Sequence, residues 1–194
     1  MNSTNMSWEL IIVDDGSDDG SSKILKKIGH QENIRSILLS KNYGQTTAIQ
    51  AGFDNAVGEY FVTLDSDLQN DPKDIPSLIK KLINEELDLV VGWRKDRKDN
   101  YFFRNLPSIL ANKLIGTITG VKLHDYGCSL KAYRGEVLRE VKLYGEMHRF
   151  IPAWMATKIP ASKISEIEVT HHPRIAGESK YGISRTFRAV SYTH

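Results

Sequence analysis

Two acidic residues one position apart, Asp65 and Asp67, follow a short apolar run with the pattern of a buried strand. A carboxylate pair on the turn after such a strand can bind a divalent cation between the protein and the phosphates of a ligand, and hard oxygen ligands suit Mg²⁺ or Mn²⁺. Gln69 can add a polar contact. Short acidic loops also serve as helix caps and turns, so the pair alone leaves both interpretations open.

A second acidic segment, Asp14-Asp15-Gly16-Ser17, ends another apolar run. Carboxylates at the end of a strand suit hydrogen bonding to a base or a ribose. The alternative is a turn in which the aspartate side chains bind nearby backbone groups before the next helix. The sequence contains neither a Gly-x-Gly-x-x-Gly motif nor a P-loop motif, which argues against the usual phosphate loops of dinucleotide-binding and P-loop proteins.

Short apolar runs alternate with helical patterns through the first half of the chain. Asp71 as a cap and Pro72 at the first helical position indicate the start of one of these helices. Because the connections are short, we expect an α/β fold with a mostly parallel sheet flanked by helices. Ligands bind such sheets beyond the carboxyl ends of the strands, where both acidic segments lie. The pattern predicts strands at 8–13, 34–39, 60–64 and 87–92, and helices at 21–28, 46–56 and 72–85.

The second half of the chain is less regular. A basic stretch at 94–98 precedes a segment from Tyr101 to Ile118 with apolar residues at helical spacing. This amphipathic segment either covers the core or lies at a membrane surface. A strand is predicted at 164–170, and the adjacent His171 and His172 after it are expected to be structural rather than metal ligands.

The composition is that of one globular domain. The chain has 194 residues, a net charge of +2 and 40% hydrophobic residues, which excludes disorder as its main state and gives no sign of a nucleic-acid partner. A single cysteine, Cys128, cannot form an internal disulfide and fits a reducing compartment, so we expect a cytoplasmic location. No run approaches the roughly 18 apolar residues that would cross a bilayer.

Taken together and in order, the motifs resemble the family 2 glycosyltransferases, and most closely their polyprenyl-phosphate group. The resemblance extends from residue 8 to about residue 188 and implies a GT-A fold. It further implies inverting transfer of a sugar from a nucleotide sugar to a polyprenyl phosphate with Mg²⁺ or Mn²⁺. The motifs are VDDGS at 13–17, NYGQ at 42–45, LDSDLQ at 64–69 and RIAGESKY at 174–181.

The resemblance also implies roles for the two acidic segments. Asp15, with Asp14 beside it, corresponds to the carboxylate that contacts the nucleotide base. Asp65 and Asp67 correspond to the residues at the diphosphate and the metal, with Gln69 next to them.

Further roles are implied for the second half of the chain. Arg94 corresponds to an arginine near the acceptor phosphate, and Asp125 with Cys128 and Ser129 to the lining of the sugar pocket. Asp125 is a position considered for base catalysis. With Asp67 at the metal and Arg94 at the acceptor phosphate, it makes up the set of catalytic candidates. A lipid phosphate is already ionised at neutral pH, and a turn role for Asp125 is an equal alternative. A loop that closes over the phosphates is implied for Arg174, Ser179 and Lys180.

The chain departs from the family pattern at both ends. Family members begin with a strand and a Pro-x-x-Asn-Glu type loop, and close relatives continue into transmembrane helices, whereas this chain has neither. We therefore expect one catalytic domain, residues 1–194, truncated at both ends and lacking the first strand, with exposed sheet edges. Its expected place is the cytoplasmic face of the inner membrane.

The identity of the donor is left open by the sequence. Similarity at 92–95 and 124–128 to bacterial undecaprenyl-phosphate enzymes favours a UDP-sugar, with GDP-mannose as the alternative. An inactive fragment or a nucleotide-binding module of the same fold is a further alternative. A nucleotidyltransferase ranks third, because its glycine-rich basic loop is absent from the sequence. The sequence indicates neither the sugar nor the oligomeric state.

Overall fold

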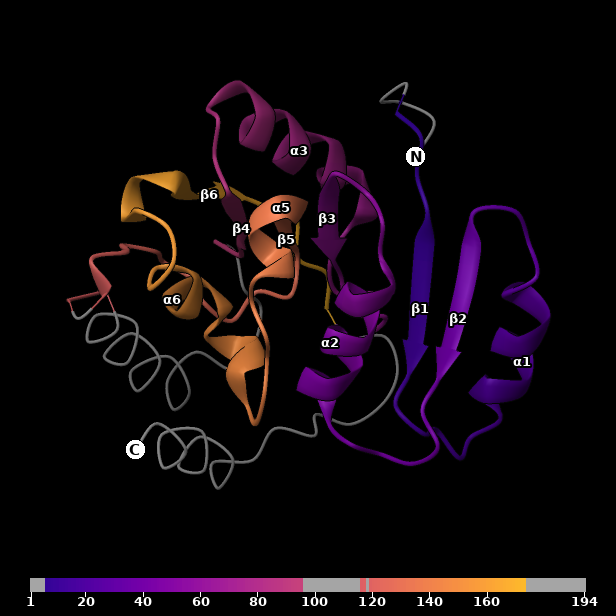
Figure 1. Cartoon of the computed structure of the whole chain (residues 1–194). Helices are drawn as coiled ribbons and strands as arrows, with labels where there is room; N and C mark the ends of the chain where they lie inside the picture. The colour runs from indigo at the N-terminus through magenta and orange to yellow at the C-terminus, as the bar shows by residue number, and fades with distance from the viewer. Residues whose placement is uncertain (1–5, 96–115, 118, 174–194) are drawn as a thin grey trace.

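The computed structural model describes residues 6–95, 116–117 and 119–173. Strands and helices alternate through the first half, as predicted (Figure 1). The strands are β1 (Leu10–Asp14), β2 (Ile34–Leu38), β3 (Tyr60–Thr63), β4 (Leu89–Trp93), β5 (Lys131–Arg134) and β6 (Ile164–Glu168). The helices are α1 (Ser21–Ile28), α2 (Gln45–Asn55), α3 (Ile75–Asn84), α5 (Gly135–Arg139) and α6 (Ile151–Met155), with 3₁₀ turns η1 (Pro72–Asp74), η2 (Met147–Arg149) and η3 (Ala161–Lys163).

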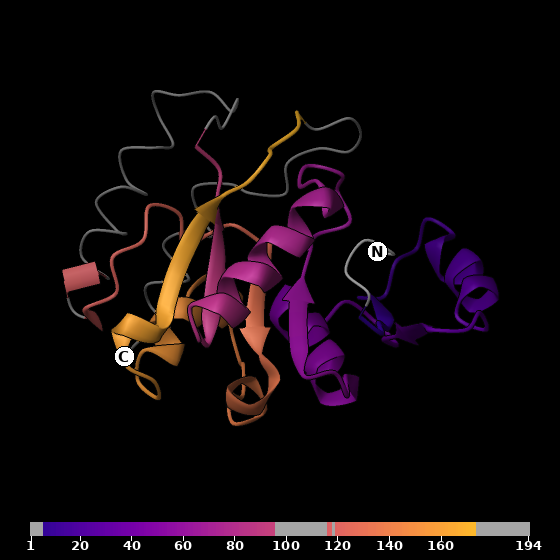
Figure 2. The same ribbon diagram turned by 90° about the horizontal axis from the view of Figure 1, so that it is seen from above.

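The strands form two sheets. β1 and β2 make a parallel pair in which Leu10 lies opposite Ile34. The other sheet has the order β3-β5-β4-β6, with β4 and β6 parallel and β5 antiparallel to both of its neighbours. Figures 1 and 2 both place the β1–β2 pair and α1 at one end of the molecule, beside β3.

The two sheets meet across α2 rather than through a shared strand. Within the described residues, β1 pairs only with β2, and β3 only with β5. Gly52 of α2 lies against the side chain of Val13. The next residue, Phe53, packs edge-on against Phe61 and Tyr133, with ring centroids 6.2 and 5.7 Å away. One helix therefore connects the sheets.

The hydrophobic core lies in the four-stranded part. Leu89 and its neighbours in β4 are fully buried, and Leu82 of α3 packs over them. Among the described residues, every buried apolar side chain lies at or after Phe53, and α1 buries none. Leu10 in β1 remains 38% exposed.

Several details differ from the sequence predictions. The ends of β1, α2 and β6 lie one or two residues from the predicted ones, and α5 and α6 were not predicted. The strand β5 was not predicted, because the charged side chain of Lys131 interrupts the apolar pattern. The helix predicted at 72–85 divides into η1 and α3, although Asp71 caps it as expected, accepting from the Lys73 amide at 2.9 Å. β4 begins two residues later than predicted, because the Leu87 amide donates to the Leu82 carbonyl at 2.9 Å and closes the end of α3.

Two predicted features lie outside the described residues. They are most of the amphipathic segment from Tyr101 to Ile118 and the whole motif at 174–181. In the ranges that the structure describes, no helix combines the length and apolar character needed to cross a membrane.

Candidate active site

The acidic loop after β3 brings the predicted carboxylates together with two amide groups. The Gln45 side chain, at the start of α2, donates from Nε2 to Asp65 Oδ1 at 2.9 Å. Asp67 Oδ1 accepts from the Gln69 backbone amide at 3.1 Å. Asp65, Asp67 and Gln69 thus share one loop at the carboxyl end of a strand, as predicted.

The electrostatics of this loop suit a cation. Burial raises the pKa of Asp65, and the neighbouring Asp67 carboxylate raises it further, whereas a hydrogen bond from Ser129 and the charges of Lys131 and Arg94 lower it. A divalent cation between the two carboxylates would remove their mutual repulsion. Within the described residues no cluster of three metal-binding side chains exists. Two carboxylates nevertheless fit Mg²⁺ or Mn²⁺, which complete their coordination with water and substrate phosphates.

Asp14 is used within its own turn. Its buried carboxylate accepts from the Ser17 amide at 3.1 Å and from the hydroxyls of Ser17 and Ser22, and these hydrogen bonds lower the pKa of Asp14. Gly16 has a φ of +70°, and a Cβ there would lie 2.3 Å from the backbone carbonyl carbon of Lys41. The geometry therefore supports the turn interpretation for Asp14.

Asp15 points instead toward the start of α2. Its carboxylate oxygens accept from the backbone amides of Tyr43 and Gly44, both at 2.8 Å. The next residue is Gln45, which binds Asp65. The residues at the N-terminal end of α2 therefore link the two acidic segments, which were both predicted to lie beyond strand ends, and the positive end of the helix dipole lies between two carboxylates.

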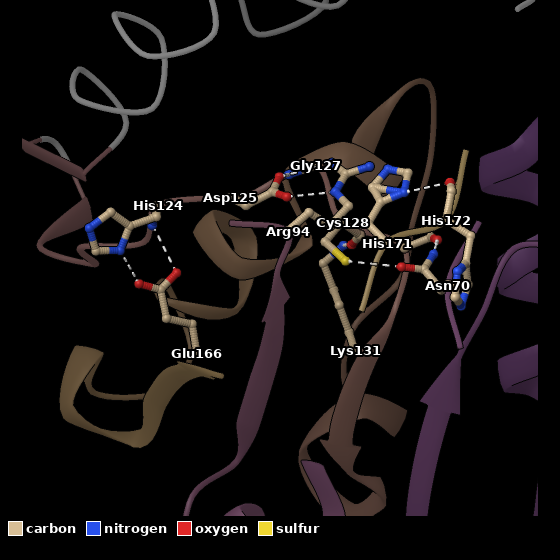
Figure 3. A network of polar contacts seen from close by, with 11 residues as sticks. Asn70, Arg94, His124, Asp125, Gly127, Cys128, Lys131, Glu166, His171 and His172 are labelled. Atoms are coloured by element: carbon tan, nitrogen blue, oxygen red, sulfur yellow. Dashed lines mark hydrogen bonds and ion pairs between the residues drawn. The ribbon is translucent and has the colours of Figure 1, made fainter. Parts of the chain in front are cut away.

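Arg94 and Asp125 form a bidentate ion pair. Arg94 Nε lies 2.6 Å from Asp125 Oδ2 and Nη2 lies 3.0 Å from Oδ1, and the two side chains are 13% and 14% exposed (Figure 3). The Gly127 amide also donates to Oδ1 at 3.1 Å. A carboxylate that accepts several charge-assisted hydrogen bonds is a weak proton acceptor. The arrangement favours a positioning role for Asp125 over the role as a base, which the sequence had left open beside a turn role.

The residue before Asp125 is also fixed. The His124 backbone amide donates to Glu166 at 2.8 Å, and the imidazole lies against the same carboxylate (Figure 3). The ring stacks on Trp93 with centroids 4.2 Å apart. Trp93 directly precedes Arg94, and His124 directly precedes Asp125. The stacked rings therefore hold together the two backbone segments that carry the ion pair.

Buried donors hold the loop that carries Cys128 and Ser129. Thr63 Oγ1 donates to the Ser129 carbonyl at 2.7 Å, and the ammonium of Lys131 donates to the Cys128 carbonyl. Lys131 is only 3% exposed, and burial lowers its pKa, while the nearby Cys128 and Asp125 act in the opposite direction. Lys131 was given no role from the sequence, because the partner that lets it be buried, the Cys128 carbonyl, is apparent only in the structure.

His171 and His172 hold the acidic loop through backbone and side-chain contacts. The His172 amide donates to the Gln69 carbonyl at 2.7 Å, and His171 forms an antiparallel bridge with Asn70. His172 Nε2 also lies 3.4 Å from Asp71 Oδ2. These contacts support the structural interpretation of the histidine pair.

Some functional candidates were missed and others cannot be placed. No role was assigned to Gln45 or Asn70 from the sequence, because a single amide side chain in a loop does not by itself indicate a binding or catalytic function. The predicted Arg174, Ser179 and Lys180 lie outside the described residues.

A mixed α/β sheet with an acidic pair beyond a strand end fits the GT-A fold of sugar transferases. The chain belongs to glycosyltransferase family 2: the family model described as "Glycosyl transferase family 2" matches residues 1–142. A solved structure with this fold is glucosyl-3-phosphoglycerate synthase from Mycobacterium tuberculosis in complex with Mn²⁺ and UDP-glucose. It has a TM-score of 0.66 and 18% identity, covering 95% of this chain and 66% of that one.

Curated relatives are more similar in sequence. Dodecaprenyl-phosphate galacturonate synthase of Rhizobium johnstonii is 60% identical over 185 residues, which covers 94% of this chain and 55% of the relative. Undecaprenyl-phosphate 4-deoxy-4-formamido-L-arabinose transferase of Aeromonas hydrophila is 40% identical over 181 residues, covering 92% and 54%. The chain therefore spans about half the length of these relatives.

Proposed function

We propose that the chain carries the catalytic site of an inverting glycosyltransferase that moves a sugar from a UDP-sugar to a polyprenyl phosphate with Mg²⁺ or Mn²⁺. The observation that carries this proposal is the Asp65–Asp67 pair in the loop after β3, where Gln45 holds Asp65. Burial and the Asp67 charge raise the pKa of Asp65, and the nearby Arg94 guanidinium acts in the opposite direction. Carboxylates and a guanidinium in one site suit a cation, a diphosphate and a second phosphate.

Transfer of a sugar to a phosphate does not require a strong base from the protein. The leaving nucleoside diphosphate develops negative charge, which a bound cation stabilises as a Lewis acid. Asp65 and Asp67 would hold that cation, and Gln45 keeps Asp65 oriented. The acceptor phosphate is already ionised, so the Arg94–Asp125 pair is needed to orient it rather than to deprotonate it.

The names of the relatives support a finer proposal for the sugar and the lipid. The 60% identical relative is named for galacturonate and dodecaprenyl phosphate, and the 40% identical relative for formamidoarabinose and undecaprenyl phosphate. We therefore infer UDP-galacturonic acid as the donor and a long polyprenyl phosphate as the acceptor. GDP-mannose remains the alternative donor.

A lipid acceptor implies that the protein works at a membrane surface. The segment from Tyr101 to Ile118 combines apolar residues at helical spacing with cationic side chains, the pattern of a helix lying at the interface. We propose that this segment contacts the cytoplasmic face of the inner membrane.

Calorimetric titration tests the donor site directly. UDP and GDP are titrated into the purified chain with Mn²⁺ and with EDTA, and we expect UDP to bind in a Mn²⁺-dependent manner. Asp67→Asn removes one charged ligand and should weaken the Mn²⁺-dependent binding by at least about tenfold, or about 1.4 kcal/mol.

Asp71→Asn is a matched control from the same loop. Asp71 caps η1 and lies near His172, so its loss should change stability more than nucleotide affinity. Equal UDP binding in Mn²⁺ and in EDTA would contradict the metal-dependent site. A preference for GDP would replace the donor, and no binding of either nucleotide would favour an inactive module of the same fold.

Mass spectrometry of the lipid product tests transfer and the choice of sugar. Dodecaprenyl phosphate in detergent is incubated with Mn²⁺ and one donor at a time: UDP-galacturonic acid, the UDP-linked formamidoarabinose or GDP-mannose. We expect the mass of the galacturonate adduct, which Arg94→Ala should reduce strongly. An adduct formed only with another donor would overturn the assignment of the sugar.

A further inference from the structure

The most buried polar side chain of the acidic loop, within the described residues, belongs to Asn70 rather than to either predicted metal ligand. Asn70 is 6% exposed. Its Nδ2 donates to Ser129 Oγ at 2.9 Å, and its Oδ1 accepts from Cys128 Sγ at 3.7 Å (Figure 3). Both ends of the amide therefore have partners in the loop before β5.

The donors and acceptors follow one order from Cys128 through Asn70 to Ser129: the thiol donates to the amide, and the amide donates to the hydroxyl. Burial raises the pKa of the Cys128 thiol, so the sulfur remains protonated and acts as a donor. The thiol thereby fixes the carbonyl end of Asn70 toward sulfur and the amino end toward Ser129. Since Ser129 Oγ accepts from Asn70, its own proton can point toward Asp65, whose pKa the nearby Ser129 hydroxyl lowers.

The backbone of Asn70 is held independently of its side chain. Asn70 forms an antiparallel bridge with His171, and the His172 amide donates to the Gln69 carbonyl at 2.7 Å. On the other side, Thr63 Oγ1 fixes the Ser129 carbonyl at 2.7 Å. The amide and the hydroxyl therefore face each other from two anchored segments.

We propose that Asn70 is a positioning residue of the donor site: linked to Cys128, it directs the Ser129 hydroxyl onto Asp65 and so orients that carboxylate for a divalent cation. The inference rests on the proposed function, because it concerns the same site. A structural role alone would affect stability and leave cation affinity unchanged.

The first experiment tests the hydrogen bonds without reference to function. Cys128 is the chain's single cysteine, so its S–H stretching band in the infrared spectrum has one source. In Asn70→Ala the band should move to higher frequency, because the thiol loses its acceptor. Asn55→Ala is the matched control: Asn55 is exposed, its side chain donates to the Ala51 carbonyl one turn earlier in α2, and its loss should leave the band in place. An unmoved band in Asn70→Ala would overturn the inference whatever the protein does.

The second experiment measures Mn²⁺ affinity by electron paramagnetic resonance at a temperature where each variant is folded. Asn70→Ala should weaken Mn²⁺ binding about tenfold, because the Ser129 hydroxyl would no longer be held toward the charged Asp65 carboxylate, and one hydrogen bond to a charged group is worth about that factor. Cys128→Ala frees the amide to turn over and should weaken binding about threefold, whereas Cys128→Ser retains a donor and should restore it.

The outcomes separate the inference from the proposed function. Unchanged Mn²⁺ affinity in Asn70→Ala, with normal binding by the unmodified chain, would overturn the positioning role and leave the metal site intact. Absence of Mn²⁺ binding by the unmodified chain, even with the expected infrared shift, would overturn the metal-dependent function and this role with it. Equal effects of Cys128→Ala and Cys128→Ser would contradict the part assigned to the thiol.

Discussion

Two apolar strands of similar sequence have very different surroundings in this molecule. β1 contains Leu-Ile-Ile-Val and β4 contains Leu-Val-Val. Leu89, Val90 and Val91 in β4 are completely buried, whereas Leu10 in β1 is 38% exposed and the next three residues are only partly buried. β4 has a strand on each side, and β1 has one only, as far as the structure describes the chain.

The difference shows that an apolar run predicts a strand but not what covers it. Polar contacts hold the β1–β2 part, such as the carboxylate of Asp15 on the amides of Tyr43 and Gly44. Packing holds the four-stranded part, where the acidic loop and the Arg94–Asp125 pair are attached. The part of the proposed site that would contact the nucleotide base, around Asp15, is therefore less well packed. The part that would bind the metal and the acceptor, around Asp65, Asp67 and Arg94, is attached to the hydrophobic core.

Truncating one apolar side chain in β4 and one in β1 should show the difference in packing between the two sheets most clearly. Leu89→Ala leaves a cavity in the core and should lower the free energy of unfolding by about 3–4 kcal/mol, whereas Ile12→Ala in the half-covered strand should cost about 1 kcal/mol. Urea unfolding followed by circular dichroism measures both. Equal losses would show that β1 is as well packed as β4.

The pH dependence of stability should report on the contact between α2 and η2. His148 Nδ1 lies 2.7 Å from Thr46 Oγ1, and burial, with the charges of Arg149 and Lys131, lowers the pKa of His148 to about 4. The unfolded chain therefore binds a proton that the folded chain does not, so stability should fall as the pH drops from about 6.5 to about 4, by at most about 3 kcal/mol. Well above pH 6.5, His148 is neutral in both the folded and the unfolded chain, so stability should no longer change with pH through this residue.

Thermal unfolding as a function of pH, with His148→Gln, measures that contribution. The variant should lose part of the slope between pH 4 and 6.5, while His30→Gln, at an exposed histidine, serves as the control. The same slope in the His148 variant would assign the acid sensitivity to other groups.

A smaller effect is expected from the polar contacts of the β1–β2 part. Asp15→Asn replaces one acceptor by a donor facing the amides of Tyr43 and Gly44, and should lower stability by about 1–2 kcal/mol. Hydrogen exchange should show those two amides exchanging faster while β4 is unaffected. Asp18→Asn, an exposed change in the same turn region, is the matched control; faster exchange throughout β4 in the Asp15 variant would contradict a local effect.

Regular local patterns were sufficient to predict much of the fold. The helix at 21–28 has the predicted bounds, and the predicted strands at 34–39 and 60–64 differ from β2 and β3 only at one end. β5 could not be predicted in this way, because Lys131 is a buried lysine whose acceptor, the Cys128 carbonyl, becomes apparent only in three dimensions.

The candidate site was predictable where charge and position coincide. Asp65 and Asp67 stood out as carboxylates at a strand end, and the structure brings Asp125 and Arg94 into contact. Asn70 could not be found from the sequence, because an asparagine in an acidic loop is most simply a turn residue. Its significance depends on two partners almost sixty positions away, Cys128 and Ser129.

The facing edges of β1 and β3 also affect how the purified chain will behave in solution. In the described part of the chain, neither edge has a strand partner. An exposed edge presents a row of backbone donors and acceptors on which another molecule can add a strand. Leu10 on one strand and Leu64 just after the other, 38% and 39% exposed, add apolar surface to the same region. We therefore expect the chain to self-associate as its concentration rises.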